Sequence, residues 1–522
     1  MHLSRPVEAG IRRLLSRVDA AVNRLYGWEG NPLYQSGTIA AALLLIVTVT
    51  GIYLLFFYRL GDPYASIARI TDQWWGGRWI RGLHRYASDA AVVAILVHAI
   101  RLYAQGRSWG PRALAWVSGV SLLALVMICG WTGYVMIWDV QGQLLAQEGA
   151  RLLDRLPIFS EPISRAFVSE AALPSAFFFL NLFLHVALPI GLGLVLWLHV
   201  TRVARPVLLP PKRLAWVITG ALTALALVRP VVMEPRADLA SLHAQATLDL
   251  FYSFWLPAAM SLSPDAVWAL TLIAWVVPAL VPWWARPRAA ERPPASVVDE
   301  RHCTGCEQCY LDCPYEAIAM LSLPGEGQRM VARVDPSLCV SCGLCTGSCA
   351  PMRVGPPART GRDQLAQVKS FTAGEAPSAD AIVIVACQRG AGGITAAAGL
   401  DGAKVYPVEC VGNLHTSSIE YLVRSGVQGV LIVSCPPRDC WTREGVAWME
   451  QRLYHEREAE LQARVDRRRI RVVHAAAGEH VEVRHALAAF RAELGAMGQT
   501  EAEADVSVQR ACDTELTTSG SS

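Results

Sequence analysis

Long apolar segments dominate the first 286 residues and set the architecture of this part of the chain. Six of them come near the ~20 residues that a helix needs to cross a bilayer. They lie at about 37–58, 86–104, 113–138, 176–201, 214–233 and 266–285. The pattern predicts an all-α bundle of six transmembrane helices over residues 37–286, preceded by an N-terminal segment at 1–36.

The distribution of charge between these segments predicts how the bundle is oriented. Six spans place both termini on one side, and Lys and Arg collect in cytoplasmic segments of membrane proteins. Basic residues are frequent in 1–36, 101–112, 202–213 and 286–292. The loop 59–85 also carries five arginines, whereas 139–175 and 234–265 hold Asp and Glu. We therefore expect a multi-pass protein of the inner (cytoplasmic) membrane with both termini in the cytoplasm. The N-terminus leads directly into a full-length span, which is not typical of a signal peptide.

After residue 286 the pattern changes to short elements of a soluble type. A Pro-, Ala- and Arg-rich linker at 287–299 precedes a cysteine-rich part at 300–356. Residues 378–496 alternate short β-branched runs with helical patterns, which predicts an α/β domain with a parallel sheet. The expected strands are 381–386, 405–408, 427–433 and 470–473, and the expected helices are 416–425, 442–464 and 480–495. The polar segment 497–522 is typical of a disordered tail.

Composition supports a multidomain membrane protein that binds metals. The chain has 522 residues, of which 53% are hydrophobic, and this is too long for one domain. The net charge of +3 is small, and no basic run suggests nucleic acid. Of 14 cysteines, twelve lie in tight clusters after residue 300, which indicates metal binding in a reducing compartment rather than disulfides.

Two histidine pairs with identical spacing lie in the apolar part. His84 and His98 are fourteen residues apart, as are His185 and His199. Fourteen residues of helix rise about 21 Å and return to nearly the same face. Two such helices side by side would hold two stacked haems, each bound by one histidine from each helix. The alternative, four separate core or interfacial histidines, does not explain the matched spacing of costly ionisable groups.

Glycines repeat the same spacing on two other spans. Gly37 and Gly51 are fourteen apart, as are Gly119 and Gly133. Glycine lets a backbone approach a bulky planar group, so these helices are expected to lie against the haems. Ordinary helix packing is the alternative.

Eight cysteines form two copies of the bacterial ferredoxin motif. They are Cys303-x2-Cys306-x2-Cys309-x3-Cys313-Pro and Cys339-x2-Cys342-x2-Cys345-x3-Cys349. In this run the fourth cysteine of each copy serves the other cluster. The motif predicts an α+β ferredoxin-like domain with two [4Fe–4S] clusters, and structural zinc is the alternative. The first ligand set is Cys303, Cys306, Cys309 and Cys349, and the second is Cys339, Cys342, Cys345 and Cys313.

Four further cysteines stand at or after the ends of the expected strands. They are Cys387, Cys410, Cys435 and Cys440. Loops at the carboxyl ends of parallel strands converge, so these thiols can meet at one edge of the sheet. Buried structural cysteines are an equal alternative from spacing alone. Cys129 is expected in the core, and His415 and Cys512 are expected to be ordinary surface or tail residues.

Residues 30–205 resemble cytochrome b of the quinol-oxidising bc-type complexes. The resemblance rests on Trp79–His84, Gly133–Trp138, the loop Pro157–Pro174 and the histidine and glycine pairs. It implies that His84 pairs with His185 on an outer haem b and that His98 pairs with His199 on an inner one. Arg81 and Arg85 flank His84, where haem propionates need counter-charges. The resemblance also implies a quinone substrate and a homodimer.

The chain departs from this family at the outer quinol site. The family's Pro-Glu-Trp-Tyr, whose glutamate is thought to accept a quinol proton, is absent, and the nearest sequence is Asp249-Leu250-Phe251-Tyr252. Asp249 or His243 can substitute as a proton group, or either can be a solvated loop residue. Ile137 replaces the proline of the family's Gly-Tyr-x-x-Pro-Trp, and the chain contains no Rieske-type motif.

The last domain resembles the delta subunit of methyl-viologen-reducing hydrogenases. The matching pieces are Ala386-Cys387, Val408–Cys410 and Ser434–Trp441. The resemblance implies one [2Fe–2S] cluster held by Cys387, Cys410, Cys435 and Cys440, and electron delivery to the flavoprotein subunit of a heterodisulfide reductase. The family's first Cys-x-x-Cys is here Cys387-Gln388-Arg389-Gly390.

Together these parts predict a membrane subunit that exchanges electrons between the quinone pool and a cytoplasmic heterodisulfide-reductase-like flavoprotein. No flavin or nucleotide fingerprint follows a strand, so two-electron chemistry is expected in a partner or at a quinone. One alternative is a bifurcating quinol oxidase that works with a separate Rieske-like acceptor. Another is a non-catalytic membrane anchor for a soluble redox enzyme. Cluster ligands do not fix the direction of electron flow.

Overall fold

The computed structural model contains two compact units. One unit comprises Met1–Leu15 and Glu29–Arg286, and the other comprises Ser16–Trp28 and Pro287–Ser522. The structure describes residues 4–157, 161–167, 173–200, 208–240, 249–285, 293–322, 329–374 and 381–497, apart from short gaps at 389, 391–399, 401, 438–439, 441, 456, 458 and 477–478.

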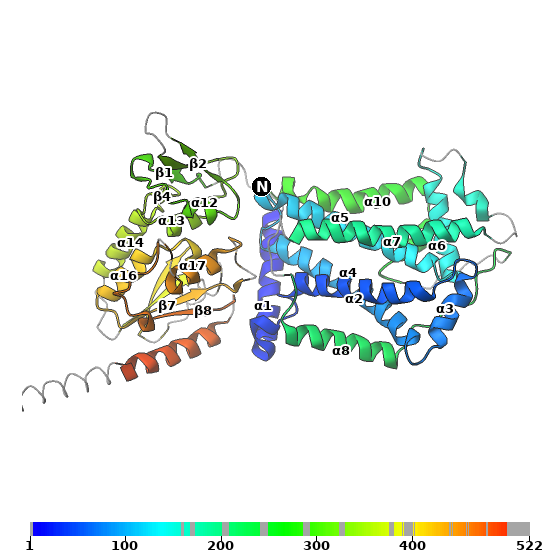
Figure 1. Ribbon diagram of the computed structural model, residues 1–522, viewed down its shortest axis with the longest axis horizontal. Helices are drawn as coiled ribbons and strands as arrows, with labels where there is room; N and C mark the ends of the chain where they lie inside the picture. Colours follow the sequence, from blue (N-terminus) through cyan, green and yellow to red (C-terminus); the bar gives the residue numbers. More distant parts are fainter. Residues whose placement is uncertain are drawn as a thin grey trace, which may run out of the picture. The chain divides into compact units, whose positions relative to one another are not determined.

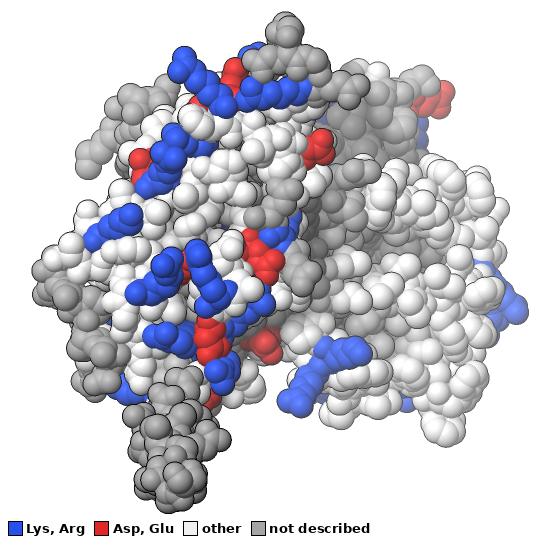
Figure 2. Space-filling model, turned by 60° about the vertical axis from the view of Figure 1, so that its left-hand side comes forward, with Lys and Arg blue, Asp and Glu red and all other residues white. Residues whose placement is uncertain are grey.

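Among the described residues of the first unit, four helices are long and apolar enough to cross a membrane (Figure 1). They are α2 (Ser36–Phe57), α4 (Gly77–Ala104), α5 (Ala113–Val135) and α7 (Ser175–Leu198). Helix α2 packs on α4, and α5 packs on α7. Many large apolar side chains of these helices remain exposed, among them Phe56 and Phe179. Figure 2 shows few charged side chains on the visible surface of this unit. Such a surface is typical of contact with lipid.

The pairing of α2 with α4 follows from small side chains. Ala87, Ala91 and Ala94 of α4 are buried against Ile39 and Leu43 of α2. Alanine lets two helix axes approach closely, as small residues do at membrane helix contacts. This close approach brings the glycines of α2 to the histidines of α4.

The two remaining predicted spans are shorter in the structure. Helix α8 (Lys212–Val228) has 17 residues, and α10 (Pro264–Ala279) has 16 and is followed by α11 (Val281–Trp284). Sixteen residues of helix rise about 24 Å, less than the ~30 Å of a bilayer's hydrocarbon core. Pro278 and Pro282 interrupt the last segment, because proline cannot donate the backbone bond that continues a helix. The four long spans are confirmed, and the six-helix bundle stays a prediction.

Four further helices lie in the first 286 residues of the chain, and residues 16–28 of the first of them belong to the second compact unit. They are α1 (Ser4–Gly30), α3 (Pro63–Asp72), α6 (Val140–Leu153) and α9 (Leu256–Ser261). Asp62 caps α3 and Asp139 caps α6, each accepting a bond from a backbone N–H of the first turn. Leu145 of α6 is fully buried in a cluster with Trp138 and Phe178, which fixes α6 on the end of the bundle.

The cysteine-rich part is a small α+β domain. It contains β1 (Val297–Val298), α12 (Gln308–Leu311), β2 (Ile318–Ser322), β3 (Met330–Val334), α13 (Leu344–Ser348) and β4 (Val354–Gly355). Strands β1 and β4 pair antiparallel, as do β2 and β3. The two cysteine loops have the same backbone, because φ is positive at Gly305 and Glu307 in the first and at Ser341 and Gly343 in the second.

The last domain is a parallel sheet covered by helices on both faces. Strands β5 (Ile382–Cys387), β6 (Lys404–Val408), β7 (Gly429–Ser434) and β8 (Ile470–His474) are parallel in the order β6-β5-β7-β8. Alternate residues of β5 and β7 enter two separate clusters, as the period of a strand requires. One cluster includes residues of α14 (Gly361–Gly374), α16 (Thr416–Arg424) and α17 (Gly445–Tyr454), and the other includes the helix 480–497.

The predicted parallel sheet is confirmed, with its four strands close to their expected positions. One helix is shorter than predicted. The pattern at 442–464 predicts a single helix, but α17 ends at Tyr454. His455 is extended, and the chain turns back so that Leu461 N donates to Arg452 O.

Candidate functional site

Helices α4 and α7 bring the four sequence-predicted histidines together in two pairs. The ring centres of His84 and His185 lie 6.5 Å apart. Two imidazoles that bind one metal from opposite sides at about 2 Å per bond hold their ring centres about 6 Å apart. His98 and His199 are close enough to interact electrostatically at the other end of the same helices. The spacing of His84 and His185 agrees with a bis-histidine site.

Backbone carbonyls of the neighbouring helices fix the tautomer of two histidines. His84 Nδ1 lies 3.0 Å from Val47 O, and His185 Nδ1 lies 3.0 Å from Cys129 O. A carbonyl oxygen only accepts, so each Nδ1 carries the proton. Nε2 therefore keeps its lone pair for a metal, the arrangement that metal-binding histidines use.

Each predicted glycine lies against one specific histidine. A Cβ on Gly37 would meet the His98 ring at 2.8 Å, and one on Gly51 would meet the His84 ring at 3.2 Å. On the other helix pair, Gly133 faces His185 at 3.0 Å and Gly119 faces His199 at 3.7 Å. The glycines thus provide space for the imidazoles, whereas the sequence pattern predicted contact with the haem planes.

A hydroxyl residue precedes each of these glycines, and the sequence analysis did not single it out. Thr50 Oγ1, Thr132 Oγ1 and Ser118 Oγ lie 3.0, 3.1 and 2.8 Å from Nδ1 of His84, His185 and His199. The fourth is Ser36, whose Oγ is buried without a hydrogen-bond partner among the described residues. The dipeptide Ser-Gly or Thr-Gly occurs at all four positions, and this repeat is the sequence signal that could have identified the four hydroxyl residues.

Basic side chains lie buried at the His98 end of α4. Arg101 and Arg107 are each 7% exposed, and the Arg101 guanidinium lies 4.0 Å above the Tyr34 ring. Ser108 is fully buried, and its hydroxyl has no partner within the described part of the chain. Buried guanidinium groups and a spare hydroxyl suit the carboxylates of a haem. Sequence reasoning used the charge of this segment only for orientation.

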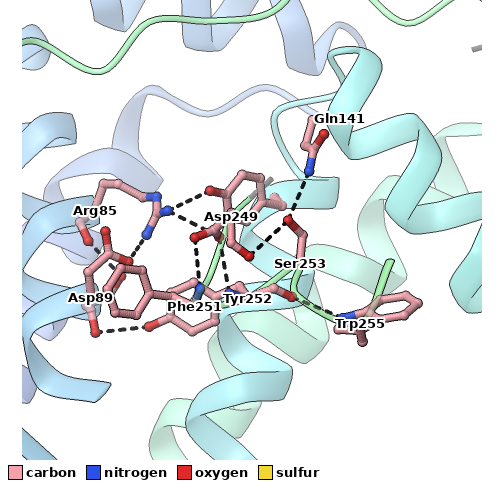
Figure 3. Close-up of polar contacts among 10 residues, drawn as sticks. Arg85, Asp89, Gln141, Asp249, Phe251, Tyr252, Ser253 and Trp255 are labelled. Atoms are coloured by element: carbon pink, nitrogen blue, oxygen red, sulfur yellow. Dashed lines mark hydrogen bonds and ion pairs between the residues drawn. The ribbon is translucent and has the colours of Figure 1, made fainter. Parts of the chain in front are cut away.

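At the His84 end, the two arginines predicted to bind propionates already have protein partners. Arg81 is buried and donates to Val231 O at 2.8 Å and to Thr71 Oγ1 at 3.2 Å. Arg85 forms ion pairs with Asp89 and with Asp249, the latter at 3.2 Å (Figure 3). It also donates to the hydroxyl of Tyr134 at 2.7 Å.

Asp249 is the centre of a short, ordered turn in Figure 3. Its carboxylate accepts from Phe251 N at 2.9 Å and from Tyr252 N at 3.1 Å, in addition to its ion pair with Arg85. Tyr252 donates to Ser88 O, and its ring covers Gly130 so closely that a Cβ there would overlap it. Asp249 thus joins the loop to α4. His243, the other predicted proton group, lies outside the described residues.

The structure brings the eight ferredoxin cysteines together in the two predicted sets. Each set lines its own hollow. Within the described residues, no group of three or more His, Cys, Asp or Glu side chains could hold a single metal ion. The first hollow contains Cys303, Cys306, Cys309 and Cys349, and the second contains Cys313, Cys339, Cys342 and Cys345.

The chemistry of these hollows suits thiolates bound to iron. Backbone N–H groups of Ser341, Ala317 and Arg353 point at cysteine sulfurs at 3.4 Å. Such bonds stabilise cluster thiolates and tune their potentials. Burial raises the pKa of the Cys345 thiol to about 12, so this thiol ionises at neutral pH only when a metal takes the place of its proton.

The four cysteines of the sheet domain meet at the carboxyl ends of β5 and β7 and in the loops after β6 and β7. All four are buried. The thiols of Cys410 and Cys435 each contact those of Cys387 and Cys440, so the four sulfurs form a closed ring. Thr442 Oγ1 lies 3.3 Å from two of the sulfurs. Gly390, which stands where the family has its second cysteine, packs on Cys435, and a Cβ on Gly390 would lie 3.0 Å from that residue.

The expectation that His415 is a surface residue is wrong. His415 is 3% exposed, and its Nδ1 accepts from Ser417 N. Nε2 therefore carries the proton and donates to Cys349 O at 3.1 Å. Burial lowers the pKa of His415 to about 4, so the ring is neutral at physiological pH. His415 thus holds the sheet domain to a cysteine of the ferredoxin domain.

Comparisons with known proteins agree with this order of parts. The cytochrome b/b6/petB family matches residues 28–206, the 4Fe-4S dicluster domain matches 302–351, and the methyl-viologen-reducing hydrogenase delta subunit matches 382–498. A solved structure named "Hyperthermophilic respiratory Complex III" is similar over 50% of this chain and 78% of that chain, with 15% identity and a TM-score of 0.38. That value is too low to define the fold.

A cytochrome b region implies haem b, and a dicluster domain implies iron–sulfur clusters. Together with the four membrane-length helices, the matches show a multi-pass membrane protein of electron transport. The chain therefore joins a cytochrome b region, a 4Fe-4S dicluster domain and a methyl-viologen-reducing hydrogenase delta subunit domain, in that order.

Proposed function

We propose that this chain connects a quinone pool, through two b haems and three iron–sulfur clusters, to a cytoplasmic heterodisulfide-reductase-like flavoprotein. The observation that carries the proposal is the arrangement of thiols in the second unit. Two four-cysteine hollows and a ring of four buried thiols belong to one compact unit that is joined to a haem-type helical bundle. Such a series provides successive sites for single electrons.

The ligand assignments of the proposal follow the observed neighbours. His84 with His185 and His98 with His199 would bind the two haems through Nε2, and the eight ferredoxin cysteines would bind two [4Fe–4S] clusters in the sets that line the two hollows. The ring of thiols would bind one [2Fe–2S] cluster. When bound, these groups supply one-electron redox chemistry. The chain's own residues orient the ligands, donate hydrogen bonds to sulfur and exclude water.

In this function the chain has six spans within 37–286 and both termini in the cytoplasm. The iron–sulfur domains at 300–356 and 378–496 lie on the cytoplasmic side. The support is the distribution of Lys and Arg between the apolar segments. The linker 287–299 connects the two parts along the chain, and the predicted tail at 497–522 lies, after Met497, outside the described residues. This topology would let a soluble flavoprotein reach the delta-subunit-type domain.

A second candidate, quinol oxidation at the His84 end, is favoured by one observation. Asp249 forms an ion pair with Arg85, the residue that follows His84 in the chain. The Arg85 guanidinium also donates a hydrogen bond to the hydroxyl of Tyr134. A carboxylate and a phenol beside a haem site are groups that accept and pass a quinol proton. In this function a Rieske-like acceptor in another chain would take the second electron.

The main proposal predicts which proteins accompany the chain. Gentle detergent extraction of native membranes followed by mass spectrometry should recover a soluble flavoprotein of heterodisulfide-reductase character. Addition of quinol to this preparation should reduce the b haems, as followed by their absorbance. A chain that copurifies with a Rieske protein or a c-type cytochrome would support the second candidate. A preparation whose haems quinol does not reduce would contradict both.

Substitution of Gly37 tests the haem assignment. In Gly37→Ala the new Cβ would meet the His98 ring at 2.8 Å, so the imidazole must move and one of the two haems should be lost. The measurement is the haem-to-protein ratio by pyridine haemochrome. Gly191→Ala on α7 is the matched control, because its Cβ meets nothing within 4 Å. Equal haem content in both variants would refute the pairing.

Substitution of Cys410 tests the third cluster. Cys410→Ser removes one sulfur of the ring and should abolish only a [2Fe–2S] signal in electron paramagnetic resonance. The [4Fe–4S] signals should persist, because their cysteines line separate hollows. Cys129→Ser in α5 is the control and should change neither signal. Loss of the [4Fe–4S] signals in Cys410→Ser would mean that the domain partition is wrong.

Substitution of Asp249 decides between the two roles of this carboxylate. If Asp249 accepts the quinol proton, Asp249→Asn should slow quinol-dependent haem reduction by the ~100-fold typical of losing a general base. Asp265→Asn, which removes an exposed carboxylate paired with Arg155, is the control. Unchanged rates in both variants would show that Asp249 only anchors the loop on Arg85.

A further inference from the structure

Arg452 of α17 is a buried cation at the junction of the ferredoxin domain and the sheet domain. It is 1% exposed and is among the largest fully buried side chains. Its Nη2 donates to Gly412 O, two residues after Cys410, and its Nε donates to Trp448 O at 3.1 Å. The guanidinium is therefore fixed beside the loop that carries one sulfur of the thiol ring.

The other face of the same guanidinium lies on the ferredoxin domain. Nη1 rests on Gly347 of α13, so closely that a Cβ there would overlap it. Gly347 stands between Cys345 and Cys349, which belong to the two ferredoxin sets. Nη1 has no hydrogen-bond partner among the described residues, although it is completely buried. An unpartnered buried N–H is costly, and this one points at the helix that carries cluster cysteines.

Arg452 keeps its positive charge in this position. Burial lowers the pKa of the Arg452 guanidinium to about 10. Electrostatic interactions with Asp312, Cys410 and Cys345 oppose burial and raise this pKa. Asp312 itself accepts from Arg457 at 2.8 Å and from Ser348 at 2.5 Å, so its charge is shared with another cation. A fixed positive charge thus lies within electrostatic reach of a sulfur of the second ferredoxin set and a sulfur of the ring.

Further contacts place the same two cysteine sets next to each other. Asn413 Nδ2 donates to Cys342 O at 3.5 Å, and a Cβ on Gly343 would lie 3.2 Å from the Asn413 side chain. Asn413 follows Cys410 by three residues, and Cys342 belongs to the second ferredoxin set. The loop after β6 therefore packs directly on the second cysteine loop.

We propose that Arg452 is a redox-positioning residue shared by the cluster at Cys345 and the cluster at Cys410. Reduction adds one negative charge to a cluster, and the nearby guanidinium stabilises that charge at both sites. Arg452 therefore raises both reduction potentials in the same direction. The inference rests on the cluster assignments of the proposed function.

The test is a redox titration of the full-length protein in detergent, followed by electron paramagnetic resonance. In Arg452→Gln the midpoint potentials of the [2Fe–2S] cluster and of one [4Fe–4S] cluster should both fall. Each fall should correspond to about a tenfold change in the ratio of oxidised to reduced cluster at the wild-type midpoint. Arg452→Lys, which keeps the charge, should lie closer to wild type. If the glutamine variant loses iron, Arg452→Met provides the same test.

Arg469→Gln is the matched control. Arg469 donates to Gln428 O and Val427 O at the opposite end of the sheet from the cysteines, so its loss should leave both potentials unchanged. Unchanged potentials in the Arg452 variants, or a change at one cluster only, would overturn the inference. Absence of a [2Fe–2S] signal in the wild-type protein would instead contradict the proposed function.

Discussion

The membrane unit depends on the close approach of a helix backbone to an imidazole. A buried histidine needs a partner for Nδ1 if Nε2 is to bind a metal, and the partner here is a carbonyl of the adjacent helix. The backbone approaches this closely only where a glycine leaves room for the ring. The same glycine–histidine contact occurs between α2 and α4 and between α5 and the α7 segment. The residue before each glycine adds a hydroxyl at the same nitrogen in three of the four cases.

In the second unit the groups that must be held ready to bind metal are cysteine sulfurs. Buried thiols are poor ligands until they ionise, and burial alone keeps them protonated. The protein supplies backbone N–H groups around the ferredoxin cysteines and a threonine hydroxyl beside two thiols of the ring. These bonds fix the positions of the sulfurs. Two side chains of the sheet domain join it to the ferredoxin domain beside cluster cysteines. His415 donates to Cys349 O, and Arg452 packs on Gly347, two residues from Cys345 and from Cys349.

Local patterns predicted much of this structure. Hydropathy identified the four long spans because a helix needs about 20 consecutive apolar residues to cross a bilayer. Short β-branched runs identified the four parallel strands. Motif spacing also gave the two sets of four cysteines that line the hollows. The interpretation failed where a residue's environment is made by distant segments. His415 contacts Cys349, 66 residues away, and no period in the sequence reports such a contact.

The same limit applies to the surroundings of Arg85, which come from distant segments and which its position in the sequence does not report. Its position after His84 suggested a counter-ion for a propionate, whereas in the structure Asp89, Asp249 and Tyr134 already engage its guanidinium. Asp249 lies where the related cytochromes have a different loop sequence, and its ion pair crosses 164 positions of the chain. An arginine with two carboxylates is electrostatically satisfied without an anionic ligand. Arg85, Asp89 and Asp249 therefore form one electrostatic unit, which fixes the loop at 249–252 on helix α4.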